Sequence, residues 1–461
     1  MPILGTFIVP HPPLIVSEIG RGQQNKIQKT IDAYKQVAQL IANMKPDTII
    51  FTTPHSDSYA DYFHISSGKT ASGSFKDFGA PQVNFTVNYA DDLTQIISSL
   101  ATAAGIPAGT LGERNKTLDH GTMVPLYFIN QAYQNYNIVR ISLSGLPLLS
   151  HYQMGKCIAS AVQRADRKVV LVASGDLSHK LTLDGPYGFA KEGEQFDKQV
   201  TQAISIGDFT RLLSFDADFC EAAAECGLKS FVIMAGSLDG KEVKPKLISY
   251  EGPFGVGYAV AVFEVIGDDD SHRYDLIYEK QESKRIKEVK SHEDYYVSLA
   301  RQSLEHYIKT KKRMHRPDNL SEELTTKKAG VFVSIKKDGS LRGCIGTIMP
   351  TTDCIADEII RNAVSSGTAD PRFEPIRENE ISRLEISVDV LSEAKPIKSV
   401  FELDVKRYGV IVRFKDRCGL LLPNLDGVTT VEDQVKIALQ KGGISAKEKY
   451  TMERFEVVRH K

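Results

Sequence analysis

The sequence predicts an α/β domain, a central sheet flanked by helices, followed by a smaller α+β domain. The chain has 461 residues, more than one hydrophobic core usually organises, so two domains are expected. In the first half, short apolar runs alternate with longer runs of helical period, which is the order typical of an α/β sheet. Beyond a charged stretch, the pattern changes to a helix followed by paired strands.

The elements of the first domain, residues 1–266, follow from the spacing of their apolar residues. Strands are predicted where apolar residues run together, at 3–9, 48–52, 137–143, 168–173 and 257–265. Helices are predicted where apolar residues recur at helical spacing, at 26–44, 91–104, 122–131, 152–165, 192–205 and 218–238.

Residues 267–290 are predicted to be a charged linker, because they carry many charges of both signs and little apolar periodicity. The second domain, residues 291–461, begins with a helix predicted at 295–308. Asp338-Gly339 between two apolar runs predicts the turn of a β-hairpin. Strands at 384–391 and 409–414 and a helix at 430–440 complete the α+β pattern.

The composition argues against polyanionic and membrane partners. The chain has 57 basic and 58 acidic residues, so net charge gives no support for nucleic-acid binding. It has no apolar run long enough to span a membrane, and prolines interrupt its apolar beginning. We therefore expect a cytoplasmic protein. Its six cysteines form no CxxC motif, so each thiol is considered individually.

Three predicted strands of the first domain run into a histidine. FIVPH ends at His11, IIFTTPH ends at His55, and VVLVASGDLSH ends at His179. Because ligands of open α/β sheets gather at the carboxyl ends of strands, we expect these imidazoles to converge. Two histidines and a third anionic ligand are a common arrangement for ferrous iron. The segment EAAAECG offers Glu225 and Cys226 as that third ligand, and the residue pattern leaves both open.

Five motifs of the first domain resemble those of LigB-like class III extradiol dioxygenases and the related Memo family. They are FIVPHPPLI, TTPHSDS, LDHGTMVPL, ASGDLSH and AECGLKSFVIMAGSLDG, in this order. The resemblance implies that His11 and His55 bind a metal and that His179 acts as an acid and base beside it. It also implies that His120 is a further active-site histidine, and Asp176 a partner that orients a ring.

The third ligand differs between the two families. The dioxygenases have a carboxylate at this position, and Memo-type proteins have a cysteine. The motif places Cys226 at that position, with Glu225 beside it. Fe(II) is the expected cofactor, and Zn or Cu are alternatives because a thiolate makes the site softer. Two of the site residues also have structural alternatives, in which His120 caps the turn before the next helix and Asp176 is a helix N-cap.

The second domain contains the run SLRGCIGT, in which strand alternation places Arg342 and Cys344 on the same face. A guanidinium beside a thiol favours the reactive thiolate, and the neighbouring glycines leave room above the sulfur. The alternative is that Cys344 packs as a small apolar residue.

Several runs after residue 290 resemble the AMMECR family, most specifically LRGCIG together with DPRF. This resemblance implies a functional cluster of Cys344 and Arg342 with Asp370 and Arg372. The fusion of the two modules resembles a protein type grouped with a radical-SAM enzyme as AmmeMemoRadiSam. It therefore implies a functional link to a radical-SAM protein.

Together these observations predict a metal-dependent oxidoreductase that is extradiol-dioxygenase-like or a Memo-like redox metal protein. Its expected substrate is a phenolic or other small molecule, and its second domain carries a reactive cysteine. The alternative is a non-catalytic protein that binds a metal or a partner in the old active-site cleft, with the second domain as an interaction module. A zinc hydrolase is less expected, because no HExxH motif accompanies the histidines.

Overall fold

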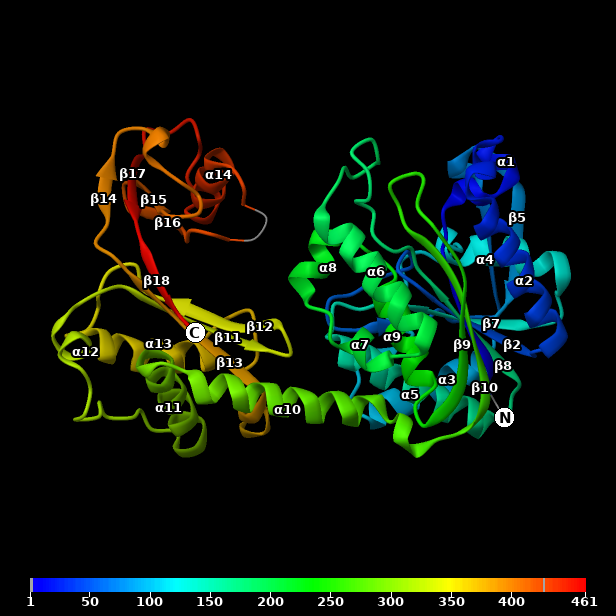
Figure 1. Cartoon of the computed structure of the whole chain (residues 1–461), viewed down its shortest axis with the longest axis horizontal. Helices are drawn as coiled ribbons and strands as arrows, with labels where there is room; N and C mark the ends of the chain where they lie inside the picture. Colours follow the sequence, from blue (N-terminus) through cyan, green and yellow to red (C-terminus); the bar gives the residue numbers. More distant parts are fainter. Residues whose placement is uncertain (1–2, 426–427) are drawn as a thin grey trace. The chain divides into compact units, whose positions relative to one another are not determined.

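The computed structural model describes residues 3–425 and 428–461. The chain forms two compact units, Met1–Glu279 and Lys280–Lys461. Each unit is considered by itself, and Figure 1 labels the elements of both. None of the helices in the described part of the chain combines the length and apolar character that a membrane span requires.

The first unit is built on a mixed six-stranded sheet with the order β7-β2-β8-β1-β10-β9. The four strands from β7 to β1 are parallel, and β10 runs antiparallel to both β1 and β9. The strands are β1 (Ile3–Val9), β2 (Thr48–Thr53), β7 (Asn137–Ser142), β8 (Val169–Ser174), β9 (Lys241–Glu251) and β10 (Tyr258–Asp268).

Helices cover both faces of this sheet, because its central strands alternate apolar side chains between two cores. Phe51 of β2 packs with α2 (Gln28–Met44) and α4 (His120–Ala132) on one face. Ile50 packs with the helices of the other face, which are α3 (Asp91–Ala103), α5 (Leu148–Ala165) and α9 (Leu228–Ser237). The predicted α/β class is therefore confirmed (Figure 1).

Three differences from the predicted elements matter for function. The helix predicted at 218–238 is two helices, α8 (Ala217–Ala223) and α9, separated by a short loop. An outer hairpin of β4 (Thr70–Phe75) and β5 (Ala80–Asn88) was not predicted. Strand β9 was also missed, although its buried and exposed residues alternate as expected for an edge strand. The remaining helices of this unit are α1 (Ser17–Gly20), α6 (Lys191–Ile206) and α7 (Phe209–Leu213).

The stretch predicted as a charged linker contains the end of β10 and most of a helix, α10 (Tyr274–His292). The boundary between the two compact units falls within this helix. Charged side chains at helical spacing are compatible with a solvated helix, and several of them form ion pairs along it, as Arg285 does with Glu282.

The second unit contains two antiparallel four-stranded sheets, which confirms the predicted α+β class. The first has the order β12-β11-β13-β18, with strands Ser340–Gly346, Val331–Lys337, Leu384–Leu391 and Val457–His460. The second has the order β14-β17-β15-β16, with strands Lys395–Ile397, Thr451–Phe455, Gly409–Phe414 and Arg417–Leu421. The helices of the second unit are α11 (Tyr295–Thr310), α12 (Glu322–Thr326), α13 (Ile355–Thr368) and α14 (Val431–Lys441).

The predicted turn of the β11–β12 hairpin is present. Asp338 and Gly339 both have positive φ, 53° and 76°, as the two central residues of a tight hairpin turn require. The turn pairs Lys337 with Ser340, and a register shift between Ile335 and Lys336 then places Cys344 opposite Ser334.

Candidate metal centre

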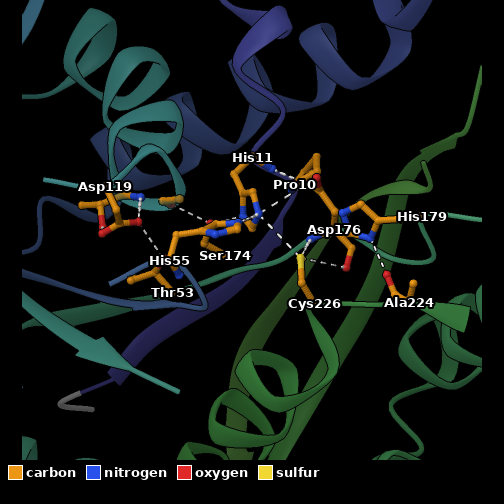
Figure 2. A network of polar contacts seen from close by, with 12 residues as sticks. Pro10, His11, Thr53, His55, Asp119, Ser174, Asp176, His179, Ala224 and Cys226 are labelled. Carbon is orange, nitrogen blue, oxygen red and sulfur yellow. Dashed lines mark hydrogen bonds and ion pairs between the residues drawn. The ribbon is translucent and has the colours of Figure 1, made fainter. Parts of the chain in front are cut away.

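Three neighbouring parallel strands, in the order β2-β8-β1, end at the same edge of the sheet. His11 and His55 closely follow the ends of β1 and β2, and His179 follows the end of β8. The structure therefore brings these three chain ends together, as the position of ligands in open α/β sheets predicts. Figure 2 shows the resulting cluster.

Two imidazoles and one thiol meet at the centre of the cluster (Figure 2). The Nε2 atoms of His11 and His55 lie 2.9 Å apart. The Sγ atom of Cys226 lies 3.6 Å from Nε2 of His11. All three ligand atoms lie within 4.8 Å of one another. Imidazole and thiolate are the ligand types that iron, zinc and copper accept.

A hydrogen-bond chain behind His11 determines which ring nitrogen is free. Ser174 Oγ donates its proton to the carbonyl oxygen of Gly121 at 2.6 Å. It can therefore only accept at its 2.9 Å contact with His11 Nδ1, which must carry the proton. The lone pair of Nε2 then points toward His55 and Cys226. Sequence reasoning missed Ser174, although its position at the end of β8 was a usable signal.

A break between α8 and α9 places Cys226 in the cluster. Ala224 adopts a left-handed conformation with φ 53° and ends α8. The Sγ atom of Cys226 then accepts the main-chain N–H of Asp176 at 3.3 Å. The Glu225 carboxylate is used elsewhere, because it accepts the N–H of Leu228 at 2.7 Å. Of the two candidates left open by the sequence, the structure brings the thiol to the histidines.

His120 is the first residue of α4, and its ring lies against His55, with ring centroids 4.0 Å apart. The helix cap is Asp119, whose carboxylate accepts the N–H of Thr122. The alternative in which His120 itself is the cap is therefore wrong. Asp119 also accepts a hydrogen bond from Thr53 Oγ1 at 2.7 Å, and that hydroxyl accepts the N–H of His55.

Asp176 is buried and caps no helix, so its alternative interpretation as an N-cap is also wrong. Its Oδ1 atom accepts the main-chain N–H of His11 at 2.8 Å. Its Oδ2 atom lies 4.0 Å from Nε2 of the same histidine. Asp176 therefore holds the backbone of a candidate ligand and places a carboxylate close to the donor atoms.

His179 lies at the side of the cluster where Cys226 enters (Figure 2). Its Nδ1 atom lies 2.6 Å from the carbonyl oxygen of Ala224. A carbonyl only accepts, so Nδ1 carries the proton and Nε2 has a free lone pair. The ring of Tyr187 packs edge-on against His179, with centroids 5.3 Å apart.

The electrostatics of the cluster favour neutral imidazoles. Burial, and then repulsion from the other imidazoles, lowers the pKa of His11 well below its usual range. The same two causes lower the pKa of His55 to about 4. Burial raises the pKa of the Cys226 thiol, and nearby carboxylates raise it further. Neutral imidazoles present lone pairs to a metal, and the thiol becomes a ligand on losing its proton. The residues present therefore fit a metal ion.

In the second domain, the structure brings three of the four predicted residues together. The main-chain N–H of Cys344 donates to Asp370 Oδ2 at 2.9 Å. Arg372 donates to the same carboxylate and to the carbonyl oxygen of Cys344. The Arg342 guanidinium instead forms a two-pronged contact with Glu380. The neighbour of the sulfur is Ser334, whose hydroxyl donates to Sγ at 3.2 Å.

Comparisons with known proteins agree with this architecture. Residues 5–261 match the family described as the catalytic LigB subunit of aromatic ring-opening dioxygenase, and residues 297–460 match the AMMECR1 family. A Clostridium acetobutylicum protein is 44% identical over 469 residues, covering 100% of both chains. A Thermotoga maritima protein is 46% identical over 150 residues, which cover 32% of this chain and 86% of that protein.

Two solved structures are also similar. One is an uncharacterized protein of Pyrococcus horikoshii, with 29% identity and a TM-score of 0.34, covering 36% of this chain and 88% of that chain. The other is an uncharacterized protein of Escherichia coli K12, with 17% identity and a TM-score of 0.40, covering 57% of this chain and 99% of that chain.

The sheet and the donors at its edge define an α/β domain with a candidate metal centre at the carboxyl ends of parallel strands. The chain belongs to the LigB family through residues 5–261 and carries an AMMECR1-family domain at residues 297–460.

Proposed function

We propose that the first domain binds one metal ion through His11, His55 and Cys226 and is an oxidoreductase acting on a phenolic or other oxygen-rich small molecule. The observation that carries the proposal is the approach of the three donor atoms to within 4.8 Å. A ferrous ion bound there would supply Lewis acidity and redox chemistry. Zinc and copper are the alternatives that a thiolate ligand also accepts.

His179 is the proton-transfer residue in this proposal. Burial lowers the pKa of its imidazole, so the ring is neutral near pH 7. The Ala224 carbonyl fixes its tautomer, which leaves Nε2 free to accept a proton from a substrate hydroxyl. At a later step, the protonated ring can return that proton to an oxygen atom of the same substrate.

His120 and Asp176 are positioning residues in this proposal. The His120 ring covers one face of His55 and restricts its rotation. Asp176 holds the main chain of His11 through its N–H. Partners of this kind fix the orientation of ligand side chains, and their loss typically weakens a site without removing it.

The test of catalysis uses protein loaded anaerobically with Fe(II) and an oxygen electrode, with catechol as the first substrate. Wild type should consume oxygen, and His179→Gln should slow consumption by about 10²–10⁴-fold because the proton acceptor is lost. The metal content of His179→Gln should be unchanged. His306→Ala, which removes an exposed histidine from α11, is the matched control and should behave as wild type.

The sulfur donor supports a second candidate, a non-catalytic metal-binding protein. A thiolate is itself open to oxidation, so this ligand suits a metal carrier better than an enzyme that activates dioxygen. Full metal occupancy without oxygen consumption on catechol or other vicinal diols would favour this candidate. Absence of bound metal would exclude both.

For the second domain we propose a reactive thiol at Cys344, supported by the hydroxyl of Ser334 and the nearby pair of Asp370 and Arg372. The fusion of the two domains supports a functional link to a radical-SAM protein. Purification of the tagged full chain from its own cells, followed by mass spectrometry, tests that link through enrichment of such a protein.

A further inference from the structure

A cleft of about 540 Å³ lies beside the histidine cluster of the first domain. One wall is the outer hairpin, which comprises β4, the turn Lys76–Phe78 and β5. The other wall is the chain leading into α4. His120 lines this cleft, and its ring also lies against the ring of His55. One imidazole therefore borders both the cleft and a candidate metal ligand.

The width of this cleft is fixed by direct packing of the hairpin on the chain before α4. The N–H of Leu118 donates to the carbonyl oxygen of Ser72 at 3.0 Å. Gly73 allows this approach, because a Cβ atom there would lie 2.8 Å from both Leu118 Cβ and Met123 Sδ. The hairpin and the chain before α4 are thus packed together, so the cleft is not a gap between independent loops.

Hydroxyl and carboxamide groups dominate the polar lining of the cleft. Cross-strand pairing places Ser72 opposite Thr86 and Ser74 opposite Asn84, so these four side chains lie on one face of the hairpin. The facing chain adds Asn115 and Thr117. Hydroxyls and carboxamides both donate and accept hydrogen bonds, so this lining suits a ligand that also does both.

The charges around the cleft do not select an ion. Lys76 and Asp77 contribute one charge of each sign. The carboxylate of Asp119 forms an ion pair with buried Arg140 at 3.4 Å. A neutral hydrogen-bonding ligand therefore fits the lining better than an anion or a cation.

An aromatic ring stands where the cleft meets the cluster. Phe78 is 40% exposed, and its ring lies edge-on to His120 with centroids 5.6 Å apart. An exposed aromatic face among hydroxyls and carboxamides complements a sugar-like ring, which has apolar C–H faces and a polar edge.

We propose that this cleft binds a neutral, polyhydroxylated group, such as a glycosyl group, attached to the part of the substrate that reaches the metal ligands. This inference rests on the proposed function for the metal-binding part of the substrate. It adds the class of the appended group and the surface that recognises it.

The first experiment compares three diols by anaerobic calorimetry on the Fe(II)-loaded full chain. The probes are 2-(3,4-dihydroxyphenyl)ethanol, its β-D-glucoside on the ethyl hydroxyl, and 3,4-dihydroxyphenylacetate. The glucoside should bind about tenfold more tightly than the parent alcohol, as one or two added hydrogen bonds would give. The acetate should gain nothing. Equal affinity for the glucoside and its parent, or a preference for the acetate, would overturn the proposal.

The matched variants lie on the same hairpin. Ser72→Ala with Ser74→Ala and Thr86→Val should abolish the preference for the glucoside while binding of the parent alcohol is kept. The control combines Thr70→Ala with Asn88→Ala, a cross-strand pair outside the cleft, and should keep the preference. Retention of the preference in the triple variant would contradict the assigned lining.

A second experiment separates this inference from the metal site. Saturation-transfer NMR with methyl β-D-glucopyranoside on metal-free protein should show contact with wild type and His11→Ala, and none with the triple variant. If the protein binds no metal or no diol while this signal persists, the proposed function fails and the cleft assignment stands. Absence of the signal in wild type overturns the cleft assignment.

Discussion

The Nε2 atoms of His11 and His55 lie 2.9 Å apart. Because the Nδ1 proton of His11 is directed at Ser174, its Nε2 atom is the acceptor and His55 is the donor of this hydrogen bond. A metal ion needs both Nε2 lone pairs, so metal binding requires His55 to carry its proton on Nδ1 instead. This change moves a proton within one ring and releases none.

The proton released on metal binding should therefore come from Cys226. At about pH 8.5 the imidazoles are neutral and Asp176, whose pKa burial raises to about 7, is ionised. The thiol is still protonated there, because burial raises its pKa. Calorimetry with Zn²⁺ in buffers of different ionisation enthalpy should give about one proton released per metal ion. Unchanged release in Cys226→Ala would show that the thiol is not the source.

Ser174→Ala should weaken metal binding without unfolding the protein. The substitution removes the acceptor that holds the Nδ1 proton of His11, so the ring can rotate or change tautomer. Loss of such a partner typically costs about 10–100-fold in metal affinity, measurable by competition with a zinc chelator. Ser237→Ala is the control, since that buried hydroxyl donates only to a carbonyl of its own helix. Equal effects of both substitutions would rule out a specific role for Ser174.

Asp197 should make the metal-free first domain less stable as the pH rises. Burial raises the pKa of this carboxyl to about 7, although Tyr250 and Ser178 donate to it. A raised folded-state pKa favours the protonated carboxyl, so its stabilising effect is lost as the pH rises toward that value. The loss is at most about 1.4 kcal/mol per pH unit between roughly pH 4 and 7. The Asp197→Asn substitution should reduce this dependence of stability on pH. The measurement is the urea midpoint of chelator-treated protein at several pH values. Identical pH profiles of wild type and variant would contradict the prediction.

Cys344 should react with iodoacetamide faster than the other five cysteines at neutral pH. Cys344 is partly exposed, and its sulfur accepts a hydrogen bond from Ser334. Cys157 and Cys354 are buried, and burial raises the pKa of Cys220 and Cys226. Time-resolved peptide mapping gives the rates. Ser334→Ala should slow the labelling of Cys344 and leave that of Cys418 unchanged, whereas equal rates for all six thiols would favour the packing alternative.

The convergence of the histidines was predictable because it depends on a general property of parallel strands. The runs ending at His11, His55 and His179 were recognisable as strands, and such strands end at one edge of a sheet. The third ligand was not decided by the same means. Choosing between Glu225 and Cys226 required the direction of each side chain, which depends on where α8 ends.

The end of α8 depends on a contact that is distant in the sequence. Three consecutive alanines before Glu225 favour a continuous helix by local propensity. The break at Ala224 lies beside a close approach of two backbones, since a Cβ atom on Gly175 would lie 2.2 Å from the Cα atom of Gly227. In the second domain, Glu380 similarly draws Arg342 into an ion pair that strand alternation could not reveal.

The metal content of the anaerobically purified protein tests the central claim most directly. Wild type should retain about one ion of iron, zinc or copper per chain, quantified by inductively coupled plasma mass spectrometry. His11→Ala, His55→Ala and Cys226→Ala should each lose it, whereas Glu225→Gln, His306→Ala and Cys220→Ala should keep it. Full metal content in all three ligand variants, or its loss in Glu225→Gln with retention in Cys226→Ala, would contradict the proposed His11, His55 and Cys226 site.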